Sequence, residues 1–379
     1  MVTKFIKSLT IIFFIFLTTG CWDYVGLEDI TIVTGIAIDM DEKKDEYKLS
    51  FEVINSASSS RQQNEIRTAI LESAGSTIFD AVRNGKKKVM NKLYFSNVQV
   101  VIISNQIARE KGINSVIDFF LREEEIRETL SFVISKEKTA RELLEKNGID
   151  NPITAFEMKK IIKKDNSVVS NTEDSELYKV FNSLNCKGMS LVLPLFHNIE
   201  NDKKQVIESD GIAVFNKDKL FDYLTSNESK SYLFIEGNVK GGIITLDMNN
   251  DKKDDVSIEI ATSSTMKNFS NNNDKYKFNV KVKMEGILGE QNGNYKEVDS
   301  KKVDKMEKMA EKKITKDIKK LIEKAQKELK VDIFSFGNLV YKNDPKVWKK
   351  IKKDWGNIFL EVEVDVDVKV HILNTAFMK

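Results

Sequence analysis

The chain has 379 residues, 41% of them hydrophobic and 31% charged, which is ordinary for a globular protein of two or three domains. Its 60 basic residues nearly balance its 58 acidic ones, so it lacks the basic footprint of a nucleic-acid-binding protein, and we expect no such partner. Two cysteines are too few for a disulfide framework or a cysteine-based zinc site.

The first twenty residues have the three parts of an export signal. Two lysines precede an apolar run at 9–17, and Gly20 and Cys21 follow. The run is about half the length of a membrane-spanning helix, which needs about 20 apolar residues. The sequence therefore predicts a cleaved signal peptide over 1–20.

A cysteine directly after a small residue is the pattern of bacterial lipoproteins, whose leader is cut before the cysteine. We expect Cys21 to carry an S-diacylglyceryl group and an N-palmitoyl chain. One acyl chain gives only marginal membrane attachment, whereas two hold durably. Thr18 stands where a bulky aliphatic residue is usual, three positions before the cysteine. The alternative is that Cys21 stays a free thiol or pairs with Cys186.

Residues 21–200 mix strand-like and helix-like patterns, which indicates an N-terminal α/β domain. Ser76 is the expected N-cap of the first helix, and the polar stretch 55–65 is an expected loop. The predicted strands are 30–38, 47–54, 97–103 and 129–135, and the predicted helices are 74–84, 113–121, 139–147 and 155–163.

Polar segments predict connections between the later elements. They lie around 165–176, 249–255, 268–275 and 290–296. Between the first two, residues 201–255 predict a small middle domain with a strand, a turn, a short helix and further strands around Gly241 and Gly242. Residues 256–379 are then the expected C-terminal domain.

The C-terminal domain has the clearest periodicities. Strands are predicted at 256–260 and 276–284, followed by a long helix at 299–330 whose apolar residues share one stripe. The predicted last strand, 358–372, alternates valine and isoleucine with acids, among them Glu361, Glu363, Asp365 and Asp367. Same-face side chains on a strand are about 7 Å apart, too far to share one cation, so we interpret this face as solvated.

Motifs that carry chemistry are missing from the sequence. It has no Walker A loop, dinucleotide-binding glycine motif, nucleophile elbow or zinc-protease helix motif. His197 and His371 are the only residues for histidine acid–base work, and we interpret both as surface or packing residues. We therefore expect no enzyme, no cofactor and no metal site.

A set of short motifs runs through the whole chain in a specific order. Their principal residues are Trp22, Asp23, Asp210, Gly211, Phe215, Gln326, Asp332, Phe336, Gly337, Trp348 and Trp355. In this order and spacing they resemble the Ger(x)C family, the C subunit lipoproteins of bacterial spore germinant receptors. From the residues alone, Asp210 and Gly211 predict a turn into a buried strand, and the two tryptophans are expected to pack against the terminal sheet.

The resemblance implies an α+β fold of three domains, each a mixed or antiparallel sheet flanked by helices. It also implies a lipid anchor at the outer face of the spore inner membrane, and a complex with integral membrane A and B subunits that responds to nutrient germinants. An alternative is a lipoprotein that binds a small-molecule ligand directly, which a deep apolar pocket between lobes would favour. A cell-envelope hydrolase is the least supported reading, because no catalytic constellation is present.

Overall fold

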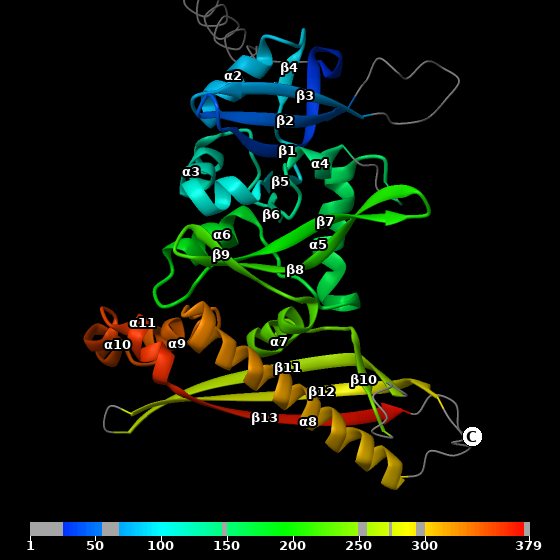
Figure 1. The fold of residues 1–379 in the computed structure, drawn as a ribbon, viewed down its shortest axis with the longest axis vertical. Coiled ribbons are helices and arrows are strands. Elements are labelled where there is room, and N and C mark those ends of the chain that lie inside the picture. Colours follow the sequence, from blue (N-terminus) through cyan, green and yellow to red (C-terminus); the bar gives the residue numbers. More distant parts are fainter. Residues whose placement is uncertain are drawn as a thin grey trace, which may run out of the picture.

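The structure is a computed structural model that describes residues 26–54, 68–145, 149, 151–248, 256–272, 275–292 and 300–374. It is elongated, with the N-terminal sheet at one end of the long axis and the C-terminal sheet at the other (Figure 1). The predicted leader, Cys21, Trp22, Asp23 and the predicted loop at 55–65 lie outside the described residues.

The first sheet has nine strands in the order β3-β2-β1-β5-β6-β7-β8-β9, with β4 also paired to β1. Its centre is parallel, from β1 through β5 and β6 to β7, and antiparallel strands extend it on both sides. The short central strands β5 and β6 are buried on both faces, which suits the apolar Val-Val-Ile-Ile and Phe-Val-Ile that they contain. The strands are β1 Ile30–Asp41, β2 Glu46–Ile54, β3 Thr68–Gly75, β4 Lys92–Tyr94, β5 Val100–Ile103, β6 Ser131–Ser135, β7 Val192–Asn201, β8 Lys204–Asn216 and β9 Lys219–Leu224.

Helices cover both faces of this sheet. On one face α2, α3 and α6 share a core with β1 and β5, and on the other face α4 and α5 pack in a smaller cluster. Thr77, one residue after the predicted Ser76, caps α2 by accepting a hydrogen bond from the Asp80 backbone N–H at 3.1 Å. The bounds are η1 Leu27–Asp29, α2 Ile78–Lys86, η3 Ile107–Lys111, α3 Asn114–Arg122, α4 Arg141–Leu144, α5 Thr154–Val168 and α6 Leu177–Asn185.

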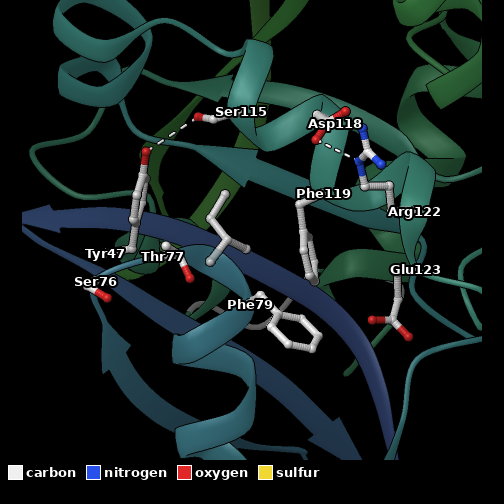
Figure 2. A pocket seen from close by; sticks show the side chains of 10 residues that line it. Tyr47, Ser76, Thr77, Phe79, Ser115, Asp118, Phe119, Arg122 and Glu123 are labelled. Carbon is white, nitrogen blue, oxygen red and sulfur yellow. Dashed lines mark hydrogen bonds and ion pairs between the residues drawn. The ribbon is translucent and has the colours of Figure 1, made fainter.

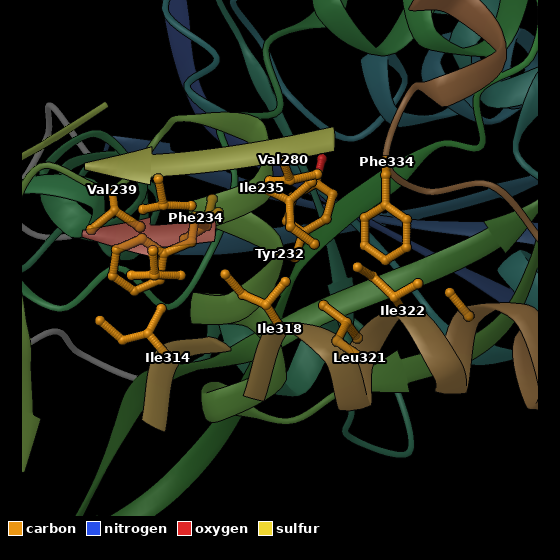
Figure 3. Packing of buried hydrophobic residues seen from close by; sticks show 14 of the residues in the cluster. Tyr232, Phe234, Ile235, Val239, Val280, Ile314, Ile318, Leu321, Ile322 and Phe334 are labelled. Atoms are coloured by element: carbon orange, nitrogen blue, oxygen red, sulfur yellow. The ribbon is translucent and has the colours of Figure 1, made fainter. Parts of the chain in front are cut away.

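The second sheet has the strand order β10-β11-β12-β13, with the last pair parallel. Its strands are β10 Ile243–Leu246, β11 Val256–Asn272, β12 Lys275–Gln291 and β13 Glu363–Asn374. The predicted long helix is α8, Ser300–Lys324, followed by a π-helical turn η4, Ala325–Leu329. Figure 3 shows Ile314, Ile318 and Leu321 of α8 directed at a core that includes Tyr232 of α7, Ser226–Glu236.

Two predictions in this part were wrong. The predicted strand at 358–372 begins only at Glu363, because Trp355 and Phe359 lie four residues apart on a helix, α11 Trp355–Glu361, and both are buried. The predicted connection at 268–275 contains the ends of β11 and β12, which stay paired as far as Asn272 and Lys275. Helices α9 Phe336–Asn343 and α10 Pro345–Ile351 precede α11.

The strands of residues 201–255 are divided between the two sheets. β8 and β9 extend the first sheet, whereas β10 pairs with β11 of the second. The fold is therefore α+β with two sheets flanked by helices, and the three predicted domain boundaries stay a prediction. Among the described residues, no helix combines the length and the apolar character that crossing a membrane requires.

Candidate functional site at the junction of the two sheets

Asp332 organises the loop that joins η4 to α9. Its carboxylate accepts hydrogen bonds from the backbone N–H groups of Phe334 at 3.0 Å, Phe336 at 3.3 Å and Gly337 at 2.8 Å. It also accepts one from the indole Nε1 of Trp355 at 3.2 Å. Four of the motif residues predicted from the sequence thus meet at one buried carboxylate.

The environment of Asp332 has opposing effects on its charge. Burial raises the pKa of the carboxyl to about 6, and the backbone donors and the Trp355 indole limit that rise because they favour the ionised form. Each oxygen of the buried carboxylate accepts two hydrogen bonds, from the loop and from Trp355, which indicates a structural function.

The Asp332 loop also contacts the segment between α6 and β7 of the first sheet. The Ser190 backbone N–H donates to the Asp332 carbonyl at 2.8 Å, and the Asn338 N–H donates to the Gly188 carbonyl at 3.1 Å. A Cβ on Gly188 would lie 2.6 Å from the Cα of Gly337 and 2.6 Å from Cη2 of Trp348. Only glycine allows the two segments to approach this closely.

Aromatic rings fill the space behind the loop. Phe336 stacks on Phe278 of β12 with 4.5 Å between ring centroids, and Trp355 meets Phe278 edge-on at 6.2 Å. Trp348 packs against Trp355 at 5.7 Å, so the tryptophans reach the terminal sheet as expected, Trp355 directly and Trp348 through it. Gln326 fixes the same region, since its Nε2 donates to the carbonyls of Phe359 at 3.0 Å and Val362 at 2.9 Å.

A second polar cluster of the junction was not predicted from the sequence. Burial raises the pKa of Glu173, before α6, to about 7, and both of its carboxylate oxygens accept from Asn238 Nδ2, at 3.1 and 2.9 Å. Glu236, at the end of α7, also has its pKa raised by burial, and Lys267 opposes this from 2.7 Å. With so many acids in the chain, no sequence pattern distinguishes these two.

The remaining motif residues lie in the first sheet, away from Asp332. Asp210 and Gly211 do not form the predicted turn: they make a bulge inside β8, opposite Leu195 of β7, with Gly211 at φ +90°. The Asp210 carboxylate pairs with Lys136 and lies 3.9 Å from His197 Nδ1. Phe215 is a fully buried core residue of β8.

Reactive groups do not converge in the described part of the chain. Cys186 is a partly buried free thiol whose pKa is raised by burial, and His371 is an exposed residue paired with Glu307. No cluster of histidine, cysteine and acidic residues suited to a metal ion occurs among the described residues.

An apolar groove lies apart from the junction, between α2 and α3 (Figure 2). It has a volume of about 680 Å³, and Phe79, Phe119 and Tyr47 are among its lining residues. The polar groups at its rim bind one another: Asp118 pairs with Arg122 at 2.9 Å. This groove is beside the first sheet and not between the two sheets.

Two family models together match most of the chain. The model of the spore germination protein N-terminal domain matches residues 23–198, and that of the spore germination B3/GerAC-like C-terminal domain matches 210–376. Spore germination protein KC of Bacillus subtilis (strain 168) is 26% identical over 99% of this chain and 97% of that protein. Spore germination protein B3 of the same organism is 25% identical over 98% of each chain.

One solved structure has the same fold. The crystal structure of the GerBC protein superposes with a TM-score of 0.56 and 21% identity, covering 90% of this chain and 97% of that one. At 21% identity, this structural similarity establishes the fold alone.

Proposed function

The chain belongs to the Ger(x)C family of spore germination proteins, and we propose that it is the lipid-anchored subunit of a spore germinant receptor that acts by binding integral membrane A and B subunits. The observation that carries this proposal is the junction around Asp332. The Asp332 carboxylate and the stacked ring of Phe336 hold the loop on the second sheet. The Asp332 carbonyl and the close approach of Gly337 to Gly188 join that loop to the segment before β7 of the first sheet. These contacts support a structural function for the junction, which fits a subunit that acts by binding partners.

Hydrogen bonds across the junction support a subunit whose two sheets move together. Contacts cross it at Asp332 with Ser190, at Glu173 with Asn238, and at the Lys240 N–H, which donates to the Asn166 carbonyl at 2.8 Å. A protein whose two sheets are fixed together can transfer a displacement at one end to a partner at the other.

Attachment to the membrane is the second part of the proposal. Cys21 lies five residues before Gly26, where the described chain begins, so lipid on that thiol would hold the first sheet close to the bilayer. We propose the outer face of the spore inner membrane as the location. Confinement there raises the effective concentration of membrane subunits.

The anchor is tested by Cys21→Ser. We expect the variant to leave the membrane fraction or to accumulate with its leader attached, while the native protein sediments with membranes and partitions into detergent. A variant that fractionates like the native protein would contradict the anchor and leave the family membership intact.

The apolar groove supports a second candidate, direct binding of a small ligand. Phe79 is 49% exposed there, although aromatic rings are usually buried. Calorimetric titration of the purified protein with nutrient amino acids and sugars tests this candidate, with Phe79→Asp as the variant. Saturable binding that Phe79→Asp abolishes would support it, and no heat from any nutrient would count against it.

A further inference from the structure

β13 is an edge strand of the second sheet. It pairs with β12 on one side only, and α8 crosses it obliquely in Figure 1. Exposed edges offer unpaired backbone groups to other chains, so proteins usually cover them.

The second half of this edge is covered by α8. The backbone N–H groups of Val370 and Ile372 donate to Glu311 Oε1 at 3.3 Å and Glu307 Oε1 at 2.8 Å. Alternate residues of a strand direct their N–H groups to the same side, so those of Val364, Val366 and Val368 also point away from β12. Within the described chain, these three N–H groups have no hydrogen-bond partner.

Strands β3, β9 and β10, at the other sheet edges, each have a side-chain contact to a backbone carbonyl. Basic side chains donate to their outward carbonyls: on β10, β9 and β3 these are Lys313 to Thr245 at 2.8 Å, Arg109 to Phe221 at 2.8 Å and Lys88 to Glu72 at 2.9 Å. No such contact reaches the backbone of the first half of β13 within the described chain.

A groove of about 750 Å³ lies between this edge and α8. Its strand wall is Val366–Lys369, and its helix wall carries five lysines against Glu311 and Glu323: Lys308, Lys312, Lys316, Lys319 and Lys320. Glu323 already pairs with Lys327, and none of the five lysines has a carboxylate within ion-pair distance in the described chain. The groove combines the backbone donors of Val366 and Val368 with five lysines that have no carboxylate partner, and Asp367 adds one acid on the strand wall.

We propose that this groove, the β13–α8 groove, binds an extended acidic segment of a protein partner, which adds to β13 as a fifth strand of the sheet. Carbonyls of the segment would accept from the N–H groups of Val364, Val366 and Val368, and its carboxylates would pair with the α8 lysines. The identification of the partner as another receptor subunit rests on the proposed function. The groove itself does not.

Two other occupants fit less well. A second copy of the chain would bring its own lysine-lined α8 against this one, which costs like-charge repulsion. An anionic membrane would satisfy the lysines, but a flat lipid surface cannot supply a row of carbonyls to a strand edge.

The test uses the full mature chain in detergent and a fluorescent ten-residue peptide that alternates glutamate with threonine. Fluorescence anisotropy should show saturable binding that weakens at least tenfold in Lys312→Glu/Lys316→Glu. Lys349→Glu/Lys350→Glu, which changes the same charge on α10, should bind like the native chain. A peptide N-methylated at alternate residues keeps its charge but cannot pair as a strand, so it should not bind.

Several results would overturn the proposal. Equal binding of the methylated peptide would reduce the interaction to charge, and equal binding by the Lys312→Glu/Lys316→Glu variant would place it elsewhere. A native dimer that Val366→Pro converts to a monomer would identify a second copy as the occupant. Binding to phosphatidylglycerol vesicles, without peptide binding, would identify a membrane.

The same variants separate this proposal from the proposed function. Co-purification of the A and B subunits with the native chain tests the function whatever the groove does. If those subunits co-purify equally with Lys312→Glu/Lys316→Glu, and the peptide binds neither form, the groove proposal is wrong and the function stands.

Discussion

Gly188 and Gly337 meet backbone to backbone, and a Cβ on either would lie 2.6 Å from the Cα of the other. A Cβ on Gly337 would also lie 2.6 Å from Nε1 of Trp355. We expect Gly337→Ala to lower the free energy of unfolding by about 1–3 kcal/mol, because overpacking forces these segments apart. Urea unfolding followed by tryptophan fluorescence measures the loss.

Gly356 provides the matched control for that substitution. It lies in α11, and a Cβ there meets nothing within 4 Å. Gly356→Ala should leave stability unchanged or raise it by up to about 1 kcal/mol, through helix propensity. Equal losses in both variants would show that close packing at Gly337 is not the cause.

Glu173→Gln tests the buried carboxyl of the junction. Because the pKa of Glu173 is raised from 4.5 to about 7, its contribution to stability is fully present below pH 4.5 and is lost as pH rises through 7. The native protein should therefore lose thermal stability over this range more steeply than Glu173→Gln, whose side chain does not titrate. Melting temperatures at pH 5 and pH 8 measure the difference, and parallel profiles would contradict it.

Lys267 and Glu236 form an ion pair, and we expect the loss of one partner to cost more stability than the loss of both. Lys267 Nζ lies 2.7 Å from Glu236 Oε1 and donates to the Phe334 carbonyl at 2.9 Å, and both side chains are largely buried. Lys267→Met should cost about 3 kcal/mol by leaving the acid without a partner, and adding Glu236→Gln should recover much of that loss. A double variant no more stable than Lys267→Met would refute the coupling.

We expect substitution of Gln326 by glutamate to destabilise the protein. Its Nε2 donates to two carbonyls, and Gln326→Glu would place a carboxylate against both oxygens. We expect a loss of about 2–3 kcal/mol at pH 8, and a smaller loss at pH 4.5, where the acid is largely protonated and can donate. A loss independent of pH would point to shape alone. Chemical denaturation at the two pH values measures this.

Much of the fold was predictable where burial follows a simple period. The stripe that includes Met306, Ile314 and Leu321 predicted the long helix. The apolar run at 30–38 predicted β1, and the alternation at 47–54 predicted β2. The strand prediction was wrong at 358–361, where Ile358 and Leu360 fit an alternating pattern. The segment is helical because Trp355 and Phe359, four residues apart, are both buried. β3 was missed because its exposure does not alternate regularly.

The junction could be predicted only in part. Asp332, Gly337 and Trp355 were identified as motif residues, but the sequence cannot show that one carboxylate joins them. Glu173 and Glu236 carried no signal, because their burial depends on the docking of two sheets distant in sequence. Local sequence patterns predict helices and strands, whereas the pKa values of buried acids depend on contacts between those elements.

Affinity purification of the tagged, full-length chain from detergent-solubilised spore membranes tests the central claim most directly. We predict recovery with two multi-span membrane proteins, identified by mass spectrometry as the A and B subunits, and with an acylated Cys21. Recovery of the chain alone, with an unmodified thiol at that position, would contradict the account.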